Sequence, residues 1–409
     1  MTETYALAAL WLGFALAAAL LSIGLRIATA MSEILVGMVA QLAIGALAGS
    51  AVLGADQSWI KFLAGTGAIV LTFLAGAELD PAVMRTQWKE TTTIGLVAFF
   101  APFLGCAAAA RWLLHWEVGA SWLAGIALST TSVAVVYAVM LEFGLNRTHY
   151  GKTVLAACFI NDLATVLALG LMFSPFTVRT LIFVAVSVVA FAVLPWATPR
   201  FFRRFGNRPS ELEAKFLLLA LFALGALAAW ADSEAVLPAY VLGMVLAGTV
   251  GKDHALVRRL RTLTLGLLTP FYFIRAGSYV SVPALVAAPL AFFLLLAAKM
   301  ATKFAGVFPI TRAFRSPTRE GLYTTLLMST GLTFGSISAL FGLSHGIVTQ
   351  AQYSLLIAAV IGSAVVPTLI ANAFFLPHHL VGPPDADTAS AREPIAPTAT
   401  PVPASRPKS

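Results

Sequence analysis

The sequence predicts an all-α polytopic membrane protein of about 13 transmembrane helices, because of its composition, its apolar runs and the placement of its basic residues. The chain has 409 residues, of which 59% are hydrophobic and only 11% are charged, and its mean hydropathy is +0.88. Soluble domains carry about 25% charged residues. A membrane span needs roughly 20 apolar residues, so a chain of this length has room for many spans.

Apolar runs divide residues 1–376 into the predicted spans. They cover residues 4–28, 32–53, 58–78, 91–114, 119–143, 151–174, 177–197, 213–231, 235–251, 263–280, 283–308, 320–343 and 351–376. The remaining residues, 377–409, are rich in Pro, Ala, Ser and Thr, which predicts a disordered cytoplasmic tail. The two cysteines lie in apolar runs and suit packing, and no metal or cofactor motif is present.

The basic residues lie mainly in every second loop between the predicted spans. Twenty of the 26 Lys and Arg residues follow odd-numbered spans, whereas only Lys61, Arg111 and Arg179 follow even-numbered ones. Because positive residues mark the cytoplasmic side, the N-terminus is expected outside and the C-terminus in the cytoplasm. The net charge of +8 then reflects basic loops at one membrane face, and no nucleic-acid partner is expected.

One acidic residue, Asp162, lies near the centre of a predicted span. An ionisable group at that depth is unfavourable by at least about 2.5 kcal/mol, so it indicates a functional site or a buried ion pair. A lone buried carboxylate can hold a proton or a small cation but hardly both, so its alternate exposure to two sides exchanges one for the other. Asn161 beside it offers an amide oxygen, as a cation ligand or as an orienting group.

The fifth and twelfth spans contain hydroxyl-rich segments at mid-membrane depth. The first has four consecutive hydroxyls, Ser129–Ser132, and the second combines glycines with Ser329, Thr330 and Thr333. Unwound backbone is tolerated at this depth where it lines a cavity, whereas the alternative is that the hydroxyls bond back to their own helices. The two spans cross in opposite directions, which predicts inverted repeats with one broken helix each, at spans two to six and nine to thirteen.

Five stretches run in order through the membrane part: SEILVGM (Ser32–Met38), LTFLAGAELDP (Leu71–Pro81), STTSVAVV (Ser129–Val136), FINDLATV (Phe159–Val166) and STGLTFGSI (Ser329–Ile337). Together they resemble the cation:proton antiporter superfamily of sodium/hydrogen exchangers, especially its bacterial branch of sodium or potassium/proton antiporters. The resemblance implies the sodium/proton antiporter fold, in which the two broken helices cross. It also implies that Asp162 binds the proton and the cation, Na⁺ or K⁺, with help from Asn161, Thr130, Thr131 and Ser132.

Members of this family also have a basic residue in the span before the second broken helix. Lys299 and Lys303 are both candidates, one helical turn apart on the same face. The family spacing to Arg312 and to Ser329–Gly331 favours Lys303 as the charge partner that stabilises the empty or protonated site. The alternative is that Lys303 snorkels to the cytoplasm. Arg275, toward the outer end of the tenth span, is expected to snorkel or to pair at a domain interface.

The chain departs from the family pattern at two positions. Many electrogenic members have two adjacent aspartates where this chain has Asn161 and Asp162, and many have an aspartate where it has Ser132. A single titrating carboxylate favours electroneutral exchange, although electroneutral members more often have arginine at the Lys303 position. Na⁺ is the favoured cation, and K⁺/H⁺ exchange for K⁺ efflux is the main alternative. A cation channel or uniporter is a weaker alternative, and a membrane-embedded enzyme is not expected, because only one carboxylate is central.

The resemblance also implies a division of the membrane domain, residues 1–376. A mobile core is expected at 91–174 and 283–376, a dimer scaffold at 1–78 and 213–280, and a linking helix at 177–197. The expected protein is a homodimer surrounded by lipid in the bacterial inner (plasma) membrane, where it serves pH homeostasis.

Overall fold

The computed structural model of the protein describes residues 2–25, 27–48, 53–77, 79, 86–173, 177–206, 208–233 and 235–381. Every regular element within these ranges is helical, which confirms the predicted all-α class. The predicted tail beyond residue 381 lies outside the described residues, and so does part of the stretch Leu71–Pro81.

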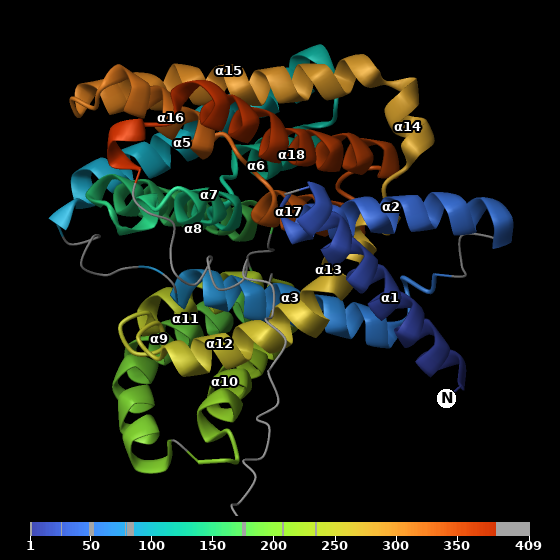
Figure 1. Ribbon diagram of the computed structural model, residues 1–409. Helices are drawn as coiled ribbons and strands as arrows, with labels where there is room; N and C mark the ends of the chain where they lie inside the picture. The colour runs from blue at the N-terminus through green and yellow to red at the C-terminus, as the bar shows by residue number, and fades with distance from the viewer. Residues whose placement is uncertain are drawn as a thin grey trace, which may run out of the picture.

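The helices follow the predicted spans in chain order (Figure 1). They are α1 (Thr2–Leu25), α2 (Thr29–Ala48), α3 (Ser58–Ala77), α5 (Trp88–Ala108), α6 (Val118–Ser129), α7 (Val133–Glu142), α8 (His149–Phe173), α9 (Val178–Phe205), α10 (Leu212–Trp230), α11 (Val236–Leu246), α12 (His254–Leu263), α13 (Thr269–Ser278), α14 (Val282–Ala287), α15 (Pro289–Ala313), α16 (Thr318–Met328), α17 (Thr333–Ser344) and α18 (Gln350–Ile370). Single π-helical turns extend α5 and α18 and join α12 to α13. Within the described ranges, ten helical segments are long and apolar enough to cross a membrane.

The tenth span differs from its prediction at its N-terminal end. Helix α12 begins at His254, well before the predicted start at residue 263, and the Asp253 side chain caps it by accepting a hydrogen bond from the Leu256 N–H at 3.0 Å. Hydropathy misses this helix because its apolar residues Leu256, Val257 and Leu260 form only one face. The basic residues between them therefore belong to a helix and not to a loop.

The fifth and twelfth spans are each broken in the middle, as predicted. Helix α6 ends at Ser129 and α7 begins at Val133, while α16 ends at Met328 and α17 begins at Thr333. The two breaks meet, because the Ser132 N–H donates to the Thr330 carbonyl at 3.0 Å. This contact between segments far apart in the sequence confirms the predicted crossing of two broken helices.

The helices form two groups in Figure 1. Helices α5–α8 and α14–α18 lie together in the upper half of the view, and α3 with α9–α12 lies in the lower half. In the lower group α3 and α11 approach closely at Gly76 and Gly243, where a Cβ on Gly243 would lie 2.2 Å from the Phe73 carbonyl oxygen. Helix α9 exposes a long apolar surface, which suits a helix that faces lipid.

Candidate functional site

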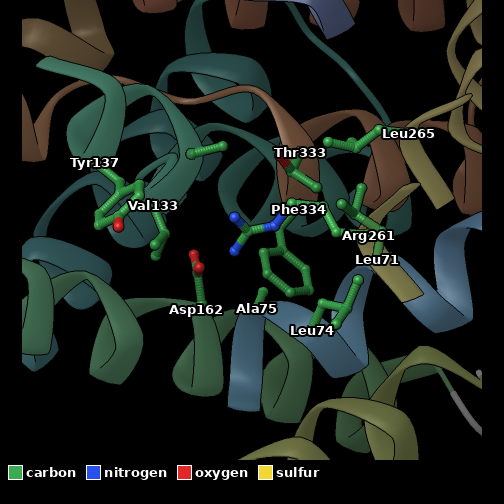
Figure 2. Close-up of a pocket in the computed structure, with 11 residues that line it drawn as sticks. Leu71, Leu74, Ala75, Val133, Tyr137, Asp162, Arg261, Leu265, Thr333 and Phe334 are labelled. Atoms are coloured by element: carbon green, nitrogen blue, oxygen red, sulfur yellow. The ribbon is translucent and has the colours of Figure 1, made fainter. Parts of the chain in front are cut away.

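Asp162 lies in the middle of α8 and is only 1% exposed. It lines a cavity of about 250 Å³ between the two groups of helices (Figure 2). The other lining residues are Val133, Ala134 and Tyr137 of α7, Thr333 and Phe334 of α17, Leu71, Leu74 and Ala75 of α3, Arg261 of α12 and Leu265 of the following turn. The Asp162 Oδ1 atom is buried without a hydrogen-bond partner, and among the described residues no salt bridge includes this carboxylate. Asp162 is therefore not held in a fixed ion pair in this conformation.

The Asn161 side chain bridges the break of the first broken helix. Its Oδ1 accepts a hydrogen bond from the Thr131 N–H at 2.8 Å, and its Nδ2 donates to the Ser129 carbonyl at 3.3 Å. Backbone groups at such a break have lost their partners within the helix, so a side chain must satisfy them. Of the two roles considered for Asn161, these contacts fit the orienting group.

The hydroxyls at the breaks form three kinds of hydrogen bond. Those of Thr130, Ser329 and Thr330 bond back to carbonyls of their own helices, at 3.2, 2.7 and 2.7 Å. The Thr131 hydroxyl instead donates across the crossing to the Met328 carbonyl at 2.8 Å. Ser132 accepts from the Val135 N–H at 3.4 Å at the start of α7. Back-bonding therefore accompanies the breaks and is not an alternative to them.

Thr333 is the one residue of the second break that also lines the cavity of Asp162. It is the first residue of α17, and Val133, which lines the same cavity, is the first residue of α7. The N-terminus of a helix carries a partial positive charge. Two helix N-termini therefore border the cavity that holds the carboxylate.

Both lysines of α15 reach the crossing of the two broken helices. Lys303 Nζ donates to the Thr131 hydroxyl at 3.0 Å, and Lys299 Nζ donates to the Ser363 hydroxyl at 2.9 Å and to the Thr130 carbonyl at 3.3 Å. Both side chains are 0% exposed, so Lys303 does not snorkel to the cytoplasm. The two ammonium groups lie where α6 ends, and the C-terminal end of a helix carries a partial negative charge.

Three further residues have environments that the sequence did not predict. Glu33 is 3% exposed in α2, although hydropathy places it at the end of a span. Arg261 lines the Asp162 cavity, although it was expected in a loop. Tyr240 of α11 donates to the Phe159 carbonyl of α8 at 2.9 Å, a contact between the two groups of helices. The spacing of Arg261 one helical turn after Val257 was a usable signal, but it depended on recognising α12.

Arg275 is paired and mostly buried in the described structure. Its Nε donates to the Ala55 carbonyl at 2.9 Å, and one of its terminal nitrogens donates to the Tyr279 hydroxyl at 2.9 Å. With Lys61 it lines a second cavity of about 190 Å³, beside the first half of α3. Of the two expectations for Arg275, snorkelling and pairing, the contacts show pairing.

A helical bundle in which two broken helices cross beside a buried carboxylate is the architecture of secondary membrane transporters. The family model described as "Sodium/hydrogen exchanger, transmembrane" matches residues 9–376. The chain therefore belongs to the sodium/hydrogen exchanger family, and the resemblance read from its five stretches is confirmed.

Several known proteins are similar to this chain. Cation/H(+) antiporter 18 of Arabidopsis thaliana is 23% identical over 83% of this chain and 46% of its own length. The Probable Na(+)/H(+) antiporter 3 of Methanocaldococcus jannaschii is 25% identical over 59% and 63%, respectively. The glutathione-regulated potassium-efflux system protein KefC of Shigella flexneri is 24% identical over 77% and 52%. The chain thus spans about half the length of these curated relatives.

A solved structure supports the fold independently. The sodium proton antiporter MjNhaP1 of Methanocaldococcus jannaschii aligns with a TM-score of 0.69 at 16% identity, over 93% of this chain and 98% of that one. At this identity the likeness establishes the shared fold.

Proposed function

We propose that the protein is a secondary active antiporter that exchanges a monovalent cation for H⁺ at Asp162. The observation that carries the proposal is the Asp162 Oδ1 atom, which is buried in a cavity without a hydrogen-bond partner. A carboxylate oxygen in that environment needs a proton or a cation, because an uncompensated buried charge is strongly unfavourable. The names of the relatives, which include Na⁺/H⁺ and K⁺ systems, agree with this exchange.

Each residue at the crossing has a role in the proposed cycle. Asp162 holds either the proton or the cation, and Thr333 is the nearest break hydroxyl that lines its cavity. Asn161 holds the broken backbone open by satisfying Thr131 and Ser129. The hydroxyls of Thr130, Thr131 and Ser132 become cation ligands only if they exchange their present hydrogen bonds for the ion.

Lys303 is the proposed charge partner, with Lys299 as the alternative. Lys303 donates to the Thr131 hydroxyl, and the Thr131 N–H donates to Asn161, the residue before Asp162, so hydrogen bonds link Lys303 to the neighbour of the carboxylate. Its ammonium stabilises the ionised carboxylate when the cation has left and before the proton arrives. Lys299 donates hydrogen bonds to the Ser363 hydroxyl and to the Thr130 carbonyl, so it also stabilises the crossing.

Alternating access is proposed to come from motion of a core, residues 91–174 and 283–376, against a scaffold, residues 1–78 and 213–280. The cavity of Asp162 lies where these segments meet, and Tyr240 bonds across the same boundary. The helix 177–197 links the two parts. A homodimer in the bacterial inner membrane, with the N-terminus outside, completes the proposal.

Na⁺ is the proposed cation, and the exchange is proposed to be electroneutral, because Asn161 leaves Asp162 as one titrating carboxylate at the cavity. K⁺ is the alternative, since KefC of Shigella flexneri, a potassium-efflux protein by name, is among the relatives.

The test is proton movement in proteoliposomes that carry a preset pH gradient, with Na⁺, K⁺ or Li⁺ added in turn. Wild type is compared with Asp162→Asn and with Asp56→Asn, a matched control in which an exposed aspartate changes. Cation-dependent dissipation that is lost only in Asp162→Asn supports the proposal and identifies the ion. Full exchange by Asp162→Asn would overturn the central role of this residue, and passive cation flux without proton coupling would indicate a channel.

A further inference from the structure

Two cavities follow one another along the same two helices, α3 and α17. The cavity of Asp162 is lined by one part of each helix, and the second cavity, of about 190 Å³, is lined by the adjacent part. These parts are 71–75 and 333–334 for the first cavity, and 61–69 and 337–344 for the second. At a rise of about 1.5 Å per residue, less than one helical turn separates them on either helix. The two cavities are therefore successive spaces on one boundary between the groups of helices.

Tyr240 lies in the interval between the two cavities. It follows Val236, which lines the second cavity, by four residues and so lies on the same face of α11. Its ring meets the ring of Phe334, which lines the cavity of Asp162, edge to face at 5.5 Å between centroids. Tyr240 is 0% exposed, so its ring forms part of the packed layer that separates the two cavities.

The Tyr240 hydroxyl connects this layer to the helix of Asp162. It donates a hydrogen bond to the Phe159 carbonyl at 2.9 Å, and Phe159 lies three residues before Asp162 on α8. Helix α11 packs backbone to backbone against α3, since a Cβ on Gly243 would lie only 2.2 Å from the Phe73 carbonyl oxygen. The hydrogen bond therefore joins a helix of the proposed scaffold to the helix that carries Asp162 in the proposed core.

This hydrogen bond fits one position of the core only. Motion of α8 along the boundary carries the Phe159 carbonyl away from the Tyr240 hydroxyl, whose position is fixed by α11. The carbonyl lies within a continuous α-helix, where it also accepts from the N–H four residues later, so breaking the bond leaves it satisfied. The bond can thus open and close as the core moves without leaving a buried backbone group unpaired.

Resting on the exchange function proposed above, we propose that the Tyr240 hydroxyl is a latch that holds Asp162 at its present cavity. The latch is the hydrogen bond from Tyr240 to the Phe159 carbonyl, and it stabilises the conformation in which the second cavity is separated from the carboxylate. When the latch opens, the core moves and Asp162 approaches the second cavity, which is the entrance from the other side of the membrane. Tyr240 is a positioning residue, because it acts on the side to which Asp162 is exposed and not on the ion itself.

The experiment measures how readily each cavity opens to water, from the reaction rates of two introduced cysteines with a water-soluble maleimide. Ala75→Cys reports on the cavity of Asp162, and Ala68→Cys, seven residues earlier on the same face of α3, reports on the second cavity. The protein is held in lipid nanodiscs, which expose both membrane faces to the reagent. Both native cysteines are 0% exposed, so the protein without an introduced cysteine is the blank.

Each reporter is combined with Tyr240→Phe, which removes the hydroxyl and keeps the ring. Tyr323→Phe is the matched control, because Tyr323 is also 0% exposed and donates to Asn372 at 3.1 Å within the core. The ratio of the Ala68→Cys rate to the Ala75→Cys rate is expected to rise about fivefold in Tyr240→Phe, which corresponds to about 1 kcal/mol, the ordinary contribution of one hydrogen bond. The ratio stays at the wild-type value in Tyr323→Phe.

An unchanged ratio in Tyr240→Phe overturns the latch. An equal rise in Tyr323→Phe also overturns it, because the loss of any buried hydroxyl then explains the effect. The proposed function is tested separately, by cation-dependent proton movement in proteoliposomes of the wild type. Exchange by wild type with an unchanged ratio in Tyr240→Phe overturns the latch alone, whereas absence of exchange by wild type overturns the proposed function on which the latch rests.

Discussion

Replacing Asn161 with alanine removes the side chain that spans the break of the first broken helix. Two backbone groups lose their partner in the same substitution, the Thr131 N–H and the Ser129 carbonyl. Both belong to fully buried residues, so water does not replace the lost amide without opening the crossing. The alanine methyl group also leaves a small void beside Asp162.

The size of the effect follows from these two bonds. A buried backbone group left without a partner is unfavourable by about 1–3 kcal/mol, so Asn161→Ala is expected to destabilise the protein by roughly 2–6 kcal/mol. Asn161→Asp is expected to lose less, because its carboxylate still accepts from Thr131. It loses only the 3.3 Å donation to Ser129, where two acceptor oxygens now face each other.

The assay is thermal unfolding of the purified protein in detergent, followed by tryptophan fluorescence. Asn372→Ala is the matched control, because Asn372 accepts one hydrogen bond from the Tyr323 hydroxyl at 3.1 Å and belongs to the π-helical turn after α18, not to a break. The expected order of stability is wild type and Asn372→Ala above Asn161→Asp, with Asn161→Ala lowest. If Asn161→Ala unfolds at the same temperature as Asn372→Ala, the bridging role of this amide is wrong.

Three further predictions concern other contacts. Lys303→Ala is expected to lower the exchange rate by about tenfold or more, because it removes the hydrogen bond from the Lys303 ammonium to the Thr131 hydroxyl. Hydrogen bonds of charged groups contribute roughly 1.5–3 kcal/mol. An unchanged rate in proteoliposomes contradicts this prediction. Gly331→Ala is expected to destabilise the protein by about 1–3 kcal/mol, because the new Cβ would lie 2.3 Å from Lys299 Nζ and 2.8 Å from Thr130 Oγ1. Gly13→Ala is the control and should be neutral in the same melting assay, because its Cβ would meet no atom within 4 Å. The hydrogen bond from Lys61 lowers the pKa of the Asp56 carboxyl. The contribution of this carboxylate to stability is therefore complete at neutral pH and is lost as the pH falls through the lowered pKa. Asp56→Asn should flatten the acid side of a profile of melting temperature against pH, and an unaltered profile excludes this contribution.

The sequence predicted the features that depend on local composition. Long apolar runs located the spans, and the clusters of hydroxyls and glycines located both breaks, because these residues compete with helical hydrogen bonding. It did not predict the start of α12, whose single apolar face gives low mean hydropathy. The position of Arg261 in the Asp162 cavity was missed for that reason, since it depends on α12 being a helix that faces the cavity.

Two features of the core also could not be predicted from the sequence, because they depend on tertiary packing. The two lysines of α15 look equivalent in sequence, and only the folded chain distinguishes their partners, Thr131 for Lys303 and Ser363 for Lys299. Glu33 was missed because the depth of a residue near a span end depends on how its helix packs and tilts. Neither property is encoded in periodicity.

The contacts of Asn161 bear on why a carboxylate is dispensable at this position. An aspartate accepts hydrogen bonds but, when ionised, donates none, so it satisfies the Thr131 N–H and leaves the Ser129 carbonyl without a partner. The amide satisfies both backbone groups without adding a second negative charge next to Asp162. In this chain the break is held by a neutral group, and Asp162 is the carboxylate that lines the cavity. Asn161→Asp should therefore separate two properties of this position, its support of the broken backbone and its charge. If exchange in Asn161→Asp becomes sensitive to membrane potential while that of wild type is not, the charge at this position sets electrogenicity. If both are insensitive to potential, the number of carboxylates at the crossing does not set the stoichiometry.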